Sequence, residues 1–177
     1  MMVRILALLI FIIPNIGLSE QPSEAVIAQL RQMRRNWSEF QQFDRKNVRV
    51  RNQAGDKFRA GSISIEEHNR RVLVVYQEIL PKAKSLRDKY KVIKVQEYDP
   101  KRLRNIYYQF LKSYIELIEY SVRQWNVNLK VIPHETEEGI KLSEVMLRRA
   151  NQLRNVSNQI QVKYNTRSPM ERRAPSQ

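Results

Sequence analysis

The two histidines are the first residues to test for chemistry, because histidine is a common metal ligand and general base. Neither His68 nor His134 has a glutamate three residues before it, so the Glu-x-x-His motif of di-iron helical bundles is absent. His134 and Glu135 match the start of the helical zinc-protease motif, but Glu138 stands where its second histidine would be. We interpret His134 as part of an acidic helix start and His68 as a core or interface residue, and we predict no metal site.

Other catalytic groups give no stronger signal. Glu116 and Glu119 lie in the most apolar stretch and could do acid–base work if buried, but the spacing of Glu119 and Arg123 predicts an ordinary pair on a helix surface. The chain has no cysteine, which excludes thiol nucleophiles and thiolate zinc sites. It has no glycine-rich phosphate loop and no nucleophile elbow. We predict that the protein is not an enzyme and uses no cofactor.

Basic residues are the strongest chemical feature of the chain. Nine of them fall in positions 82–104, where the acids are Asp88, Glu97 and Asp99. They are Lys82, Lys84, Arg87, Lys89, Lys91, Lys94, Lys101, Arg102 and Arg104. We expect them to form one anion-binding patch where two successive helices meet, extended by Arg45, Arg49 and Arg51. The alternative is that they are solvated helix faces spread around the molecule.

The net charge of +14 favours partners that carry negative charge. An anionic membrane or envelope surface fits best, since each nearby basic residue contributes about 1 kcal/mol to binding. An acidic protein or an unfolded client comes second. Nucleic acid is the least favoured, because no DNA- or RNA-binding motif is visible and export removes the usual targets.

The amino-terminal residues predict that export. Arg4 precedes nine apolar residues, positions 5–13, and small residues at Gly17 and Ser19 fit a cleavage site after Ser19. The apolar run is shorter than the roughly 20 residues that span a bilayer, so an uncleaved anchor is the less favoured alternative. We predict a signal peptide at 1–19 and a periplasmic or secreted mature protein without a transmembrane span.

Helical periodicity organises the rest of the chain. Apolar residues spaced four and three apart predict a first helix from an N-cap at Ser23 to about Asn47, followed by a long connection over 44–62. Ser64 and Glu67 form a capping box that starts a second helix, with a kink or restart expected at Pro81 and an end near Lys94.

Two more helices follow in the same way. Asp99 and Pro100 predict the start of the third helix, whose wide apolar stripe reaches Trp125. An alternating, extended segment over 126–133 leads to a fourth helix from an N-cap at Thr136 to about Tyr164. Its expected apolar face comprises Leu142, Met146, Ala150, Leu153, Val156 and Ile160.

These helices predict an all-α antiparallel four-helix bundle over 20–164 and a disordered basic tail over 165–177. The alternative is a small sheet formed by 48–51, 92–96 and 127–132. The leading functional hypothesis is an exported non-enzymatic binding or scaffolding protein of the cell envelope or extracellular space. A periplasmic holdase-type chaperone and a secreted effector are the alternatives, and the oligomeric state stays open.

Overall fold

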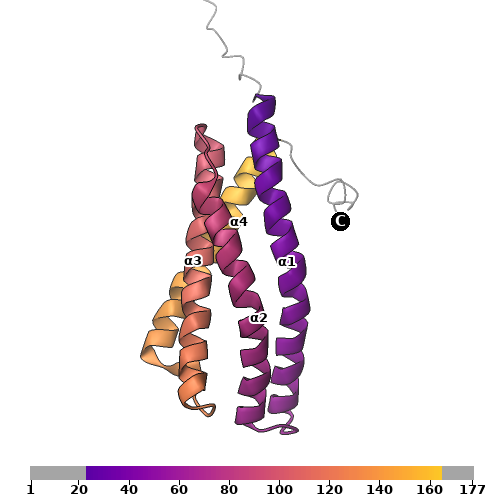
Figure 1. The fold of residues 1–177 in the computed structure, drawn as a ribbon, viewed down its shortest axis with the longest axis vertical. Coiled ribbons are helices and arrows are strands. Elements are labelled where there is room, and N and C mark those ends of the chain that lie inside the picture. The colour runs from indigo at the N-terminus through magenta and orange to yellow at the C-terminus, as the bar shows by residue number, and fades with distance from the viewer. Residues whose placement is uncertain (1–22, 165–177) are drawn as a thin grey trace, which may run out of the picture.

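The computed structural model describes residues 23–164, and the predicted signal peptide and tail lie outside this range. In the described part all regular structure is helical and no strand is present, which excludes the small sheet there. The elements are α1 (Glu24–Arg59), α2 (Ile65–Val92), α3 (Tyr98–Val127), the short 3₁₀ helix η1 (Pro133–Glu135) and α4 (Glu137–Tyr164). In Figure 1 the chain descends along α1, ascends along α2, descends along α3 and ascends along α4.

Helix α1 extends to Arg59, well past its predicted end near Asn47. The expected connection over 44–62 is wrong: the chain stays helical to Arg59, and only a short turn separates α1 from α2. The reason is a buried residue at every seventh position of α1: Val26, Met33, Phe40, Asn47 and Ala54. Asn47 and Ala54 are weak hydrophobic signals in a sequence, but packing against other helices buries both. The turn itself uses Gly61, whose φ of 68° is easily adopted by glycine.

The other helix starts were predicted with mixed success. Ser64 Oγ accepts a hydrogen bond from the Glu67 N–H (3.2 Å), which confirms the start of α2. Thr136 Oγ1 accepts one from the Gly139 N–H (3.1 Å), which confirms the start of α4. Helix α2 continues through Pro81. Asp99 as the N-cap of α3 is wrong, because α3 begins at Tyr98 and Asp99 lies buried in its first turn.

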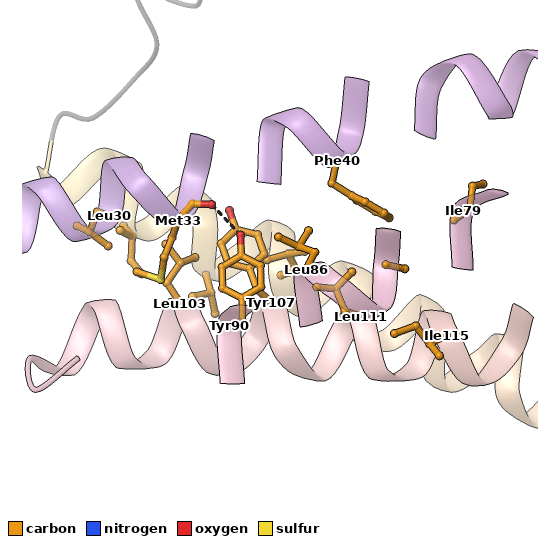
Figure 2. Close-up of a cluster of buried hydrophobic side chains, with 14 of the residues drawn as sticks. Leu30, Met33, Phe40, Ile79, Leu86, Tyr90, Leu103, Tyr107, Leu111 and Ile115 are labelled. Atoms are coloured by element: carbon orange, nitrogen blue, oxygen red, sulfur yellow. Dashed lines mark hydrogen bonds between the residues drawn. The ribbon is translucent and has the colours of Figure 1, made fainter. Parts of the chain in front are cut away.

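The helices pack mainly in chain order, α1 on α2, α2 on α3 and α3 on α4. One core cluster with residues from all four helices holds them together, and part of it is shown in Figure 2. Helix α4 crosses behind α3 in Figure 1 and reaches the first part of α1, where Arg34 Nη2 donates to the Ser157 carbonyl (3.4 Å). The body is therefore four helices thick at the end where α1 begins.

At the opposite end α4 diverges from α1 and α2. Of its predicted apolar face, Leu153, Val156 and Ile160 are buried, whereas Leu142, Met146 and Ala150 are only half-buried. The segment before α4 is held by its carbonyl groups. Asn69 Nδ2 donates to the carbonyls of Leu129 (2.7 Å) and Val131 (3.0 Å), and Trp125 Nε1 donates to that of Val131 (3.0 Å).

Candidate functional site

The histidines lie together at the end of the molecule that holds the α1–α2 turn. Both line a cleft of about 370 Å³ between that turn and η1. His68 is half-buried, with Nδ1 2.9 Å from Asn69 Oδ1, and His134 is exposed. Among residues 23–164 no group of histidine, aspartate and glutamate side chains is arranged to hold a metal ion.

The same cleft carries no excess of positive charge. Its two arginines are each paired with a carboxylate: Arg51 Nη2 is 3.5 Å from Asp44 Oδ1, and Arg59 Nη2 is 2.5 Å from Asp56 Oδ1. Arg51 also lies over the ring of Tyr76, 5.6 Å from its centroid. Arg51 therefore belongs to the interior side of α1 and not to an exposed basic patch. Because both arginines are already paired with carboxylates, this cleft is a weak candidate for an anion site.

Glu116 and Glu119, the two candidate catalytic glutamates, each form an ion pair with a lysine. Glu119 Oε1 accepts from Lys84 Nζ on α2 (2.7 Å), so the predicted pair with Arg123 is wrong. The reason is that the α2–α3 interface brings Lys84 against Glu119, a contact that spacing along α3 alone does not reveal. Glu116 Oε1 lies 3.9 Å from Lys112 Nζ, and both side chains are about half-exposed.

Three of the nine predicted patch residues are engaged along the body of α2. Lys82 Nζ lies 3.3 Å from the ring centroid of Phe43 on α1. Lys84 pairs with Glu119, and Arg87 Nη2 is 2.9 Å from Asp88 Oδ1. These three side chains neutralise charge or pack on neighbouring helices, so they contribute little to an external anion site.

The other six gather around the α2–α3 turn, and we name them the basic end: Lys89, Lys91, Lys94, Lys101, Arg102 and Arg104. Arg104 Nη1 donates to the Ile93 carbonyl (2.9 Å), which ties the turn to α3 without neutralising the charge. Within the described residues, no member of the basic end forms an ion pair with a carboxylate. The turn thus concentrates positive charge outside direct ion pairs, although Arg102 is near enough to the Asp99 carboxylate to help lower its pKa.

Two hollows open beside these cations. A cleft of about 530 Å³ between α3 and α4 is lined by Tyr98, Lys101 and Arg102 together with the apolar Val156. A second cleft, of about 400 Å³, is lined by Lys91, Arg104 and polar neighbours. Cations therefore line both hollows at this end of the molecule.

Helix α1 adds two cations near this end, Arg31 and Arg35, which lie far from the basic end in the sequence. Tyr90 OH donates to the Met33 carbonyl (2.7 Å), which brings the exposed Arg31 and Arg35 of α1 level with the end of α2. Only the pairing of α1 with α2 reveals this proximity, because more than fifty positions separate the two segments.

A buried carboxylate secures the basic end. Asp99 Oδ2 accepts from Lys163 Nζ (2.6 Å) and from Tyr164 OH (2.7 Å), so the last turn of α4 is attached to the first turn of α3. Burial opposes ionisation of Asp99, but these hydrogen bonds outweigh it and hold the pKa of its carboxyl below the ordinary value of 3.8.

We expect Asp99→Asn to lower the free energy of unfolding by about 1 kcal/mol at pH 7, a modest value because Lys163 is exposed to solvent. A carboxyl whose pKa is lowered by folding stabilises above its unfolded pKa and loses that effect as pH falls through the folded value. The difference between wild type and variant, measured by urea unfolding, should therefore shrink below about pH 3. Asp88→Asn, at an exposed pair with its neighbour, is the control and should change stability by less than about 0.5 kcal/mol.

In residues 23–164 no helix combines the length and the apolarity that a bilayer-spanning segment requires. Comparison of the chain with models of protein families, with curated proteins and with solved structures found no match.

Proposed function

We propose that this is an exported, non-enzymatic binding protein whose basic end binds an anionic surface or an acidic partner. The observation that carries the proposal is the gathering of six cations around one turn without a described carboxylate to pair them. Opposite charges brought to such a surface gain attraction that no intramolecular pair has already satisfied. Removal of residues 1–19 would leave an antiparallel helical body outside the cytosol.

The amount of binding energy follows from the number of cations. Each basic residue near an anionic membrane surface contributes about 1 kcal/mol at moderate salt. Three such residues therefore correspond to about 3 kcal/mol, or roughly a hundredfold in affinity. The attraction falls within a Debye length, so it should weaken steeply as salt is raised.

The test removes the same number of charges at two places. We expect the triple variant Lys91→Gln, Lys94→Gln, Lys101→Gln to bind phosphatidylglycerol vesicles or polyglutamate roughly a hundredfold more weakly than wild type at about 0.05 M salt. The control replaces Arg45, Lys46 and Arg49 by glutamine. These exposed cations of α1 follow Phe43, which contacts Lys82 in the body of α2, so the expected extension of the patch by Arg45 and Arg49 does not reach the basic end. Both triples have the same net charge, so co-sedimentation and titration separate a local site from overall charge.

Equal losses in the two triple variants would show that only the net charge matters and would contradict a site at the basic end. Binding of wild type that is insensitive to salt between about 0.05 M and about 0.5 M would contradict the electrostatic proposal itself.

A second function has one observation in its favour. Ile140 and Leu147, one heptad apart on the diverging half of α4, are 46% and 57% exposed. Apolar side chains presented in this way favour a holdase-type chaperone that binds unfolded clients. Suppression of the aggregation of a heat-unfolded test protein by wild type, and its loss in Ile140→Ser, Leu147→Ser, would support this alternative over the charge-based one.

A further inference from the structure

We propose that the partner of the basic end is an anionic lipid bilayer, and that Val92 and Tyr98 insert into its interface. This inference rests on the proposed function and adds the class of partner and the two anchoring side chains. The inference rests on one observation: exposed apolar side chains and cations without an ion pair lie together at the α2–α3 turn.

The apolar groups stand at the two helix ends that flank the turn. Val92 is the last residue of α2 and Tyr98 the first of α3, and each is 73% exposed. Large apolar side chains exposed to this degree gain free energy when they leave water. Tyrosine suits the boundary of a membrane, because its ring is apolar and its hydroxyl remains hydrated at the level of the headgroups.

The cations flank these two residues closely in sequence. Lys91 and Lys94 lie beside Val92, and Lys101 and Arg102 follow Tyr98 within one helical turn. Long basic side chains can hold their charge at lipid phosphates while their methylene stems cover apolar surface. Exposed apolar residues with lysine and arginine close by in the sequence are typical of interfacial membrane-binding segments.

The position of the turn also suits a broad, flat partner. In Figure 1 the α2–α3 turn lies at one end of the helical body, beside the first turns of α1, which reach beyond it. A bilayer presents a continuous anionic surface that can meet several side chains at this end at once. The 530 Å³ cleft between α3 and α4 opens at Tyr98, Lys101 and Arg102 and leaves room for a lipid headgroup.

Both ends of the described part lie at this same end of the body (Figure 1). Tyr164, the last described residue of α4, is attached to Asp99 near the start of α3. Beyond it the sequence contains Arg167, Arg172 and Arg173 against one acid, Glu171. The end that carries Val92 and Tyr98 is therefore also the end to which the basic carboxyl-terminal sequence is joined, which favours an anionic surface larger than one small ligand.

The experiment uses the chain from Glu20 to Gln177 and phosphatidylglycerol vesicles at about 0.15 M salt, where charge attraction is reduced but wild type is still expected to bind. Val92→Ser, Tyr98→Ser should bind about tenfold more weakly than wild type, because two partly immersed side chains are lost. The control is Val74→Ser, Val127→Ser, which removes two other exposed valines, 52% and 89% accessible, and should bind like wild type. All four positions are exposed, so the variants are expected to fold, as circular dichroism will verify.

A second measurement reports directly whether residue 98 enters the membrane interface. In Tyr98→Trp the new indole should shift its emission to shorter wavelength on anionic vesicles and be quenched by lipids brominated near the headgroup end of the acyl chains. The existing Trp37 and Trp125 are half-buried and buried in the body and provide the unshifted background in wild type.

The outcomes separate this inference from the proposed function. If wild type binds vesicles and polyglutamate in a salt-sensitive way but Val92→Ser, Tyr98→Ser binds vesicles like wild type and Tyr98→Trp is not quenched, membrane insertion is wrong while the basic end remains an anion site. An equal loss of polyglutamate binding in that variant would assign the α2–α3 turn to an acidic protein and overturn the lipid assignment. Failure of wild type to bind either probe at low salt would instead overturn the proposed function.

Discussion

Replacing Gly139 by alanine is expected to lower the free energy of unfolding by about 3 kcal/mol. A Cβ at this position would lie 1.7 Å from the Pro133 carbonyl oxygen and 2.9 Å from Thr136 Oγ1. The first of these atoms belongs to the backbone of η1, which cannot rotate away as a flexible side chain would. The substitution must therefore displace the start of α4, and with it the cap in which Thr136 Oγ1 accepts from the Gly139 N–H.

The matched control is Gly55→Ala in α1. There a Cβ would meet only Arg59 Nη1 at 3.9 Å, an ordinary contact with a flexible side chain. Alanine is favoured over glycine inside a helix, so stability should rise by about 0.5–1 kcal/mol. Urea unfolding followed by circular dichroism measures both. An unchanged stability for Gly139→Ala would contradict the close packing of η1 on α4, and a loss for Gly55→Ala would contradict the helical continuation of α1.

The replacement of Tyr90 by alanine is expected to cost about 4 kcal/mol of stability. Tyr90 is fully buried at the centre of the four-helix end, where its ring stacks on that of Tyr107 with centroids 4.9 Å apart. Its hydroxyl donates to the Met33 carbonyl of α1 (2.7 Å), as the dashed line in Figure 2 shows. One side chain thus joins α2 to α3 through its ring and to α1 through its oxygen, and alanine would leave a cavity between them.

Tyr90→Phe separates the two contributions. It keeps the ring and removes one hydrogen bond, so a loss of about 1 kcal/mol is expected near neutral pH. Burial, with a further effect of Tyr107, raises the pKa of Tyr90 above its ordinary value of 10.0. Unfolded tyrosine releases its proton above about pH 10, so this raised pKa predicts that wild type loses stability there more steeply than Tyr90→Phe. Equal stability of Tyr90→Ala and Tyr90→Phe in calorimetry would show that the ring does not fill the core as described.

The local parts of this fold were open to prediction because they depend on neighbours in the sequence. A helix start needs an N-cap side chain within three residues of the N–H it satisfies, and Ser64 and Thr136 meet this condition in the structure. The wide apolar stripe that reaches Trp125 likewise predicted the buried face of α3. The basic residues near the α2–α3 turn could be grouped because a short connection keeps successive helix ends together.

Tertiary structure alone decided the features that depend on distant partners. Asn47 and Ala54 continue the buried face of α1 only because other helices cover them, so the sequence pattern ended too early. Asp99 looked like an N-cap, but it binds Lys163 and Tyr164, more than sixty positions away. Glu119 pairs with Lys84 of α2 for the same reason.

In the candidate site, too, some features follow from the sequence and others only from the packing of the helices. The sequence by itself determined that nine cations fall within positions 82–104, and their spacing was enough to expect a patch there. It could not show that Lys82 lies over Phe43, or that Lys84 and Arg87 meet carboxylates, leaving six around the turn. Spacing along a chain determines which residues share a helix and a face, whereas the packing of one helix on another determines which charges are neutralised and which apolar side chains stay in water.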